Sequence, residues 1–264
     1  MHKITTLSNG IRVVSEEIPY VRSVSIGLWI GNGSRCELPE ENGMSHFIEH
    51  MLFKGTDRRS AGDIAYEIDA IGGQLNAFTT REYTCYYTKT LDEHAEIAID
   101  ILSDMLFSSK LDPDAMKLEK NVVIEEINMY EDEPDELVSD LIMEAVYGNT
   151  PLGRTILGTP ESLSGITPEN MRSYLNNHYT SKNTVIAISG HYDDSLFDLL
   201  EKYFANPKMS DKKPKIEICE YKSGNSIVRR KDCEQIQLVA SFKSIDKNVR
   251  SISPTTAIVG RNGK

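Results

Sequence analysis

Two histidines and a glutamate between residues 42 and 56 have the types and spacing needed to bind and use a metal ion. His46 and His50 are four residues apart, about one helical turn, so on a helix both imidazoles project from the same face. Glu49 borders that face, where its carboxylate can reach a water on the metal without being a ligand. Apolar residues at 44, 47, 48, 51 and 52, and the absence of proline, predict a short helix with Asn42 as its N-cap.

The pentapeptide from His46 to His50 has the H-x-x-E-H pattern of the inverted zincins. Neutral imidazole is a good zinc ligand, and catalytic zinc takes three protein ligands and keeps one position open for water. The pattern therefore predicts a zinc site that needs a third ligand. The plain alternative is a solvated or core-packed helix that happens to carry two histidines.

The third ligand must come from elsewhere in the chain. The other four histidines are scattered: His2, His94, His178 and His191. A helix predicted over 114–130 places Glu119, Glu125 and Glu126 beside apolar residues, and a buried carboxylate is costly unless it meets a cation. Glu119 and Glu126 are seven residues apart on one face, but Glu125 is nearly as good a ligand candidate as Glu126. The alternative is a charged helix edge that makes surface ion pairs.

Composition limits the class of protein. The 264 residues allow one large domain or two small ones. Lys and Arg total 29 against 40 Asp and Glu, and this net charge of -11 argues against nucleic acid as the main partner. No apolar run approaches the roughly 20 residues that span a bilayer, and no signal peptide opens the chain, so we expect no membrane association. The four cysteines form no cluster, which indicates reduced thiols and a cytoplasmic location.

Strands and helices are mixed without strict alternation, which predicts an α+β fold whose mixed, mostly antiparallel sheet packs against helices. A polar, proline-flanked linker is expected at 206–215, between a first domain at 1–205 and the start of a second at 216–264. Three strands, at 216–221, 227–231 and 235–242, are expected to open the second domain. The first domain is predicted to have strands at 4–7, 12–17, 24–30, 74–79, 83–91 and 183–189, and helices at 60–71, 93–108, 114–130, 136–146 and 195–204.

Several motifs together carry a family resemblance. They are residues 46–56, Gly72-Gly73, Asn76-Ala77, the trio Thr79, Glu82 and Thr84, and residues 122–127. In these the chain resembles the N-terminal half of the M16 peptidases, the group of pitrilysin, insulinase and mitochondrial processing peptidase. The resemblance covers about residues 4–248 and implies the α+β domain of that family.

The resemblance also implies a site and a reaction. The family's third zinc ligand is a glutamate about 76 positions after the second histidine, which is Glu126 and not Glu125. A glutamate seven positions earlier, Glu119, is implicated in catalysis and is expected to orient ligand and water. The implied reaction is zinc-dependent hydrolysis of peptides, with Glu49 as general base.

The resemblance further implies that the peptide substrate adds as a strand along Asn76, Ala77 and Phe78. The alternative for these three residues is an ordinary strand near a turn.

The chain departs from the family at its C-terminal end. Full-length members have two such domains that close around an unfolded peptide, and their second half supplies an Arg and a Tyr for the substrate. No such pair is found here, and residues 249–264 lose the family pattern. We therefore expect a truncated or frameshifted product, or a half-protein that needs a second M16 half-chain or forms a homo-oligomer. Two rival readings are a non-catalytic M16 partner subunit and a small-molecule zinc lyase resembling S-ribosylhomocysteine lyase.

Overall fold

The strands of the N-terminal 205 residues join in one mixed sheet. The computed structural model describes residues 2–205, 209–229 and 236–243. The strand order is β1-β2-β6-β3-β5-β4; β2 and β6 run parallel, and every other neighbouring pair in this sheet is antiparallel. The predicted α+β fold is confirmed. The strands are β1 Lys3–Thr6, β2 Arg12–Glu17, β3 Ser23–Ile30, β4 Gln74–Thr79, β5 Thr84–Leu91 and β6 Thr184–Gly190.

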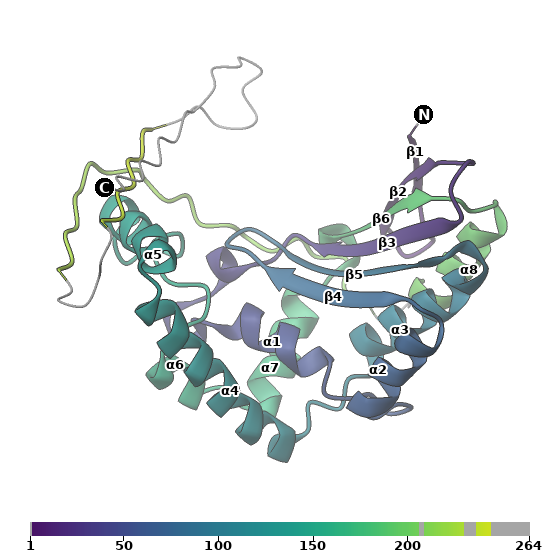
Figure 1. Ribbon diagram of the computed structural model, residues 1–264, viewed down its shortest axis with the longest axis horizontal. Coiled ribbons are helices and arrows are strands. Elements are labelled where there is room, and N and C mark those ends of the chain that lie inside the picture. Colours follow the sequence, from purple (N-terminus) through teal and green to yellow (C-terminus); the bar gives the residue numbers. More distant parts are fainter. Residues whose placement is uncertain (1, 206–208, 230–235, 244–264) are drawn as a thin grey trace.

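Helices cover one face of this sheet, with α1 beneath β4 and β5 (Figure 1). Within the described residues, none of the helices combines the length and the apolar character that crossing a bilayer requires. The helices are α1 Met44–Leu52, α2 Ala61–Ala70, α3 Ala95–Ser108, α4 Pro113–Asp132, α5 Pro134–Tyr147, α6 Pro160–Ser164, α7 Pro168–His178 and α8 Ser195–Phe204.

Side-chain caps explain half of the helix starts, those of α2, α4, α6 and α7. Asp112 accepts hydrogen bonds from the first-turn N–H groups of α4, and Thr167 accepts one from the Asn170 N–H in the first turn of α7. Helix α6 was not predicted. Thr159 followed by Pro160 carries the same start signal, but the surrounding segment is rich in Gly and Pro and was therefore expected to be a loop. The predicted cap Asn42 was wrong: the N-cap of α1 is Gly43, and the Asn42 amide donates instead to Thr155 O at 2.9 Å.

Helix α1 is stabilised by packing against its neighbours and not by its own backbone hydrogen bonds alone. It has nine residues, which is too short to be stable alone in water. Its apolar side chains are no more than 1% exposed, and each contributes about 1.5–3 kcal/mol by leaving water. This burial fixes the rotation of α1, so that the histidine face is turned toward α4. The buried apolar side chains are Met44, Phe47, Ile48, Met51 and Leu52.

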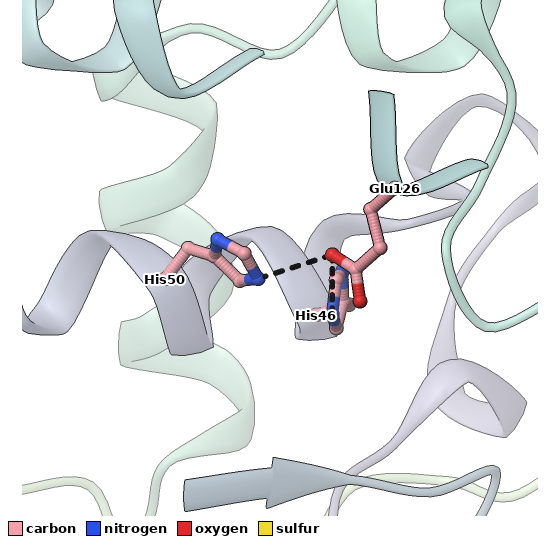
Figure 2. Close-up of side chains that lie close together, drawn as sticks. All are labelled: His46, His50 and Glu126. Atoms are coloured by element: carbon pink, nitrogen blue, oxygen red, sulfur yellow. Dashed lines mark ion pairs between the residues drawn. The ribbon is translucent and has the colours of Figure 1, made fainter. Parts of the chain in front are cut away.

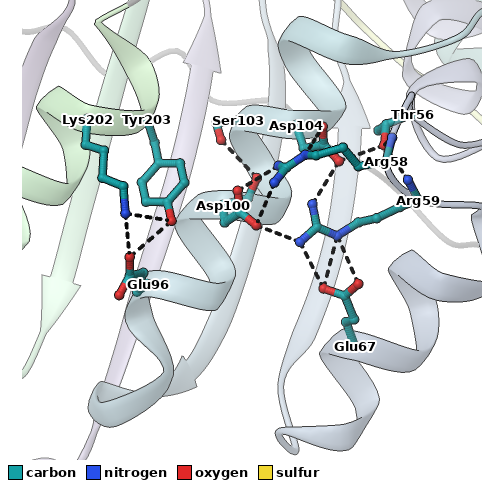
Figure 3. A network of polar contacts seen from close by, with 10 residues as sticks. All are labelled: Thr56, Arg58, Arg59, Glu67, Glu96, Asp100, Ser103, Asp104, Lys202 and Tyr203. Carbon is teal, nitrogen blue, oxygen red and sulfur yellow. Dashed lines mark hydrogen bonds and ion pairs between the residues drawn. The ribbon is translucent and has the colours of Figure 1, made fainter.

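The loop that follows α1 is tied to α3 by a partly buried ion-pair network (Figure 3). Asp104 is almost fully buried, and its carboxylate accepts hydrogen bonds from Thr56 Oγ1 at 2.6 Å, Arg59 Nη1 at 2.8 Å and Arg58 Nε at 3.0 Å. Arg59 also donates to Asp100 at 2.6 Å. The loop that follows α1 is thereby held at a fixed distance from α3.

The segments expected to open a second domain form no strand in the part of them that the structure describes. The described residues among 216–231 and 235–242 belong to no helix or strand, although Ser210 O accepts the Ser181 N–H at 2.8 Å and holds the start of this region. Ile218, Ile227 and Ile236 remain 79–88% exposed. Alternating apolar residues predict a strand correctly only where a neighbouring strand can pair with them. The predicted atypical tail, 249–264, lies outside the described residues.

Replacing Asp104 by Asn should destabilise the fold. The variant leaves two arginines facing a neutral amide, and removing one partner of a buried ion pair costs about 3 kcal/mol. We expect chemical denaturation to show this loss for Asp104→Asn. Glu96→Gln, on the exposed side of α3, should lose less, and equal losses would contradict a special role for the network.

The contribution of Asp104 should also depend on pH. Burial alone would raise the pKa of this carboxyl, but hydrogen bonds from Thr56, Arg59 and Arg58 outweigh burial and hold the pKa below its usual value. A carboxyl whose pKa is lowered on folding stabilises the protein above its unfolded pKa of about 3.9, and this stabilisation is lost as the pH falls through the folded value. The difference in unfolding free energy between wild type and Asp104→Asn should therefore be constant near neutral pH and shrink below about pH 4.

Candidate metal centre

Three side chains that could hold a metal ion, from two helices, meet where α1 faces α4. His46 and His50 come from α1, and Glu126 reaches them from α4 (Figure 2). Glu126 Oε2 lies 3.7 Å from His46 Nε2 and 3.5 Å from His50 Nε2, and the three ligand atoms are within 4.8 Å of one another. Ligand atoms about 2.1 Å from a tetrahedral zinc are about 3.4 Å apart. The residues therefore fit a zinc ion.

The structure distinguishes between the two glutamates that the residues alone left as alternative third ligands. Glu126 is half-buried beside the imidazoles, whereas the adjacent Glu125 is exposed. The rotation of α4 decides this, because Val123 and Ile127 turn into the core. Glu126 is the one of the two that faces α1.

Protonation of the cluster suits a cation. Burial, reinforced by the nearby His50, lowers the pKa of His46 to about 4, so the ring is neutral and can bind metal at neutral pH. Hydrogen bonding with His50 lowers the pKa of Glu126 against the effect of burial. Burial would lower the pKa of His50 too, but contacts with Glu126 and Glu119 outweigh it and raise this pKa. Both carboxylates thus favour positive charge at this point, which a divalent ion also supplies.

Glu119 orients one of the two histidines. Its buried carboxylate accepts a hydrogen bond from His50 Nδ1–H at 2.8 Å, which leaves Nε2 facing Glu126. Lys54, one turn after His50, contacts the other carboxylate oxygen at 2.6 Å. Carboxylate–histidine pairs of this kind hold metal ligands in place. Lys54 was not predicted, although its i+4 spacing from His50 would have indicated it.

Glu49 lies on the same pocket and is not one of the three clustered ligand groups. The pocket has a volume of about 230 Å³ and is lined by Glu49 together with His46 and Glu126. Thr79 Oγ1 donates a hydrogen bond to Glu49 Oε2 at 2.5 Å. Thr84 uses its own hydroxyl proton on Asn32 O at 2.9 Å, so the Thr79 proton is left for Glu49. Burial raises the pKa of Glu49, against the opposing effects of Thr79 and His50.

The predicted substrate residues lie on β4, which is one of the two edge strands of the described sheet. Ala77 and Phe78 line the pocket, and Asn76 does not. Asn76 is exposed, and its side-chain oxygen accepts the N–H of Ala77 at 2.8 Å. Six further residues that were not predicted as site residues line the same pocket: Thr79, Tyr130, Asp140, Thr155, Ile156 and Leu157.

Comparison with known proteins identifies the family. The family model described as insulinase, peptidase family M16, matches residues 12–160, and a second model, the peptidase M16 inactive domain, matches residues 165–255. The chain belongs to peptidase family M16.

Relatives of this M16 chain are longer than it is. A Bacillus subtilis protein named uncharacterized zinc protease YmxG is 49% identical over 246 residues, which are 93% of this chain and 60% of that protein. A probable mitochondrial-processing peptidase subunit beta of Arabidopsis thaliana is 44% identical over 188 residues, 71% of this chain and 35% of its own. The chain thus spans at most about 60% of the length of these relatives.

A solved protease structure shares the fold. The crystal structure of a protease from Helicobacter pylori superposes with a TM-score of 0.81 at 22% identity, over 89% of this chain and 58% of that one.

The second family model begins at residue 165. Strand β6 comes after that point in the sequence, yet it lies inside the sheet between β2 and β3. The sheet of this M16 chain therefore includes residues from both matched regions.

We predict that Glu119→Gln weakens zinc binding. The amide keeps the shape of the side chain but loses the charge that faces His50 and Lys54, and removing such an outer partner typically costs 10–100-fold in metal affinity. Competition with a chromophoric chelator measures this change. Glu125→Gln, an exposed position on the same helix, should bind zinc as the wild type does. Equal affinity in all three proteins would contradict the role given to Glu119.

Proposed function

We propose that this M16 chain carries the zinc site of a metalloendopeptidase that hydrolyses peptides or unfolded polypeptide segments. The observation that carries the proposal is the meeting of His46, His50 and Glu126 at zinc-binding distances, with Glu49 on the same pocket. Zinc bound there would supply Lewis acidity towards water and the scissile carbonyl. Membership of the family favours this activity over that of a small-molecule lyase.

Glu49 is the proposed general base. Its Oε2 is held by the Thr79 hydroxyl, so Oε1 is the atom expected to take the proton from the attacking water and pass it to the leaving amine. The pKa of Glu49, raised by burial, makes the carboxylate a better proton acceptor than an exposed glutamate. Glu119 remains a positioning residue in this proposal, because it contacts His50 and Lys54.

The peptide is proposed to bind along the edge of β4. In the described sheet, β4 pairs with β5 on one side only, so its other side offers backbone groups for an added strand. Ala77 and Phe78 then lie beside the scissile bond, and Asn76 further along the strand. Backbone pairing of this kind recognises extended peptides with loose sequence demands.

A second M16 half is the proposed partner, either as further polypeptide of the same protein or as a separate chain. The longer relatives and the match to the inactive-domain model support this, and a homo-oligomer is the other arrangement that supplies a second half. The specific alternative function is a partner-dependent half-subunit that binds zinc but does not cleave alone. The domain limits at 205 and 216 and the cytoplasmic location stay predictions.

Zinc content and cleavage of a quenched fluorescent peptide test the proposal. We expect one zinc per chain and cleavage by the wild type. Glu49→Gln should keep the zinc and lose cleavage by roughly 10²–10⁴-fold, because removing a general base has that effect. Glu126→Gln should lose most of the zinc, whereas Glu125→Gln should behave as the wild type.

Two other outcomes would change the assignment of function. Zinc bound without cleavage by the wild type would support the partner-dependent alternative, and adding a second M16 half should then restore cleavage. A wild-type chain that binds no zinc would contradict the ligand set.

A further inference from the structure

A second buried carboxylate lies at the start of α1, away from the ligands. Glu37 precedes the helix by seven residues and is 2% exposed. Its Oε1 accepts the Ser45 N–H at 2.7 Å, and its Oε2 accepts the Gly43 N–H at 2.9 Å and Asn42 Nδ2 at 3.3 Å. Both oxygens are thus used on the N-terminal end of the helix that carries the two histidines.

The helix needs this contact because it has no cap of its own. The first N–H groups of an α-helix lack intrahelical partners and are normally satisfied by a side chain at the N-cap. The N-cap of α1 is Gly43, with φ of 91°, and it has no side chain to offer. A Cβ there would approach Leu157 O to 2.7 Å, so a capping residue does not fit in its place. Glu37 supplies the missing acceptor from outside the helix.

The backbone of Glu37 is itself held in place. Its carbonyl oxygen accepts a hydrogen bond from Arg154 Nη2 at 2.6 Å, which ties the loop of Glu37 to the segment that follows α5. Among the described residues, no Lys, Arg or His forms an ion pair with its carboxylate. A buried charge without a counter-ion is costly, and here only hydrogen bonds and the positive end of the helix dipole offset it. Stability alone is a weak reason to keep such a group.

The two histidines differ in what orients them. The His50 ring is fixed by Glu119, but His46 Nδ1 is buried and has no hydrogen-bond partner among the described residues. His46 is the third residue of α1 and belongs to the turn whose N–H groups Glu37 accepts. The position of the His46 ring therefore depends on the backbone of that turn.

We propose that Glu37 is a positioning residue that sets zinc affinity by holding the first turn of α1, and His46 with it, in the metal-binding position. The inference rests on the zinc site of the proposed function. It predicts that loss of the Glu37 charge changes the position of His46, and does not only lower the stability of the fold.

The test compares Glu37→Gln with Glu40→Gln, which removes the same charge from an exposed position on the same loop. Zinc affinity is measured by competition with a chromophoric chelator, and Co²⁺ replaces zinc as a spectroscopic probe of ligand geometry. We expect Glu37→Gln to bind zinc about tenfold more weakly and to show an altered cobalt visible spectrum. Glu40→Gln should match the wild type in both. An unchanged affinity and spectrum in a folded Glu37→Gln protein would overturn the proposal, even if its melting temperature falls.

A measurement on the wild type covers the case in which Glu37→Gln does not fold. Coupling between two events is reciprocal. If the hydrogen bonds from the first turn of α1 to Glu37 raise zinc affinity, then zinc binding must stabilise those hydrogen bonds. Amide hydrogen exchange at Gly43 and Ser45 should therefore slow when zinc is added. Zinc binding that leaves both amides unchanged would overturn the proposal. A wild-type chain that binds no zinc would instead overturn the metal centre itself.

Discussion

Negative charge buried around a nine-residue helix is the constraint on which the rest of the structure depends. Glu49, Glu119 and Glu126 surround the two histidines of α1, and Lys54 is the ammonium group that contacts one of them. Carboxylates are seldom buried unless they are paired or bind a metal. Three carboxylates against one ammonium leave about two negative charges, which a divalent ion neutralises.

The fold meets this constraint by holding α1 from several directions. The sheet buries its apolar side, α4 brings Glu119 and Glu126 across its outward side, and Glu37 closes its first turn. The network around Asp104 fixes the loop that follows it. Because these contacts come from separate parts of the chain, the geometry of the site depends on the whole tertiary structure and not on the helix alone.

The sequence predicts local features of the site better than those that join distant segments. The spacing of His46 and His50 places them together on any helix, and the structure shows them so. The choice between Glu125 and Glu126 depends on how α4 rotates against the core, so the residues alone left it open and the family resemblance selected Glu126. Glu37 follows no local capping pattern, because its partners are set by the turn at residues 38–42. Its role becomes visible only when the backbone is known.

The same distinction explains the expected strands after residue 215. Ile216 and Ile218 alternate with polar residues, and Ile227 and Val228 form a short β-branched pair, yet all four remain about half exposed or more and belong to no sheet in the described chain. A strand is stabilised by its cross-strand pairs, which local pattern cannot supply. In the described sheet the edges are β1 and β4, and neither pairs with these segments. If a second M16 half is the partner, as proposed, it would provide both the missing pairing edge for these segments and the wall opposite β4 that a bound peptide requires.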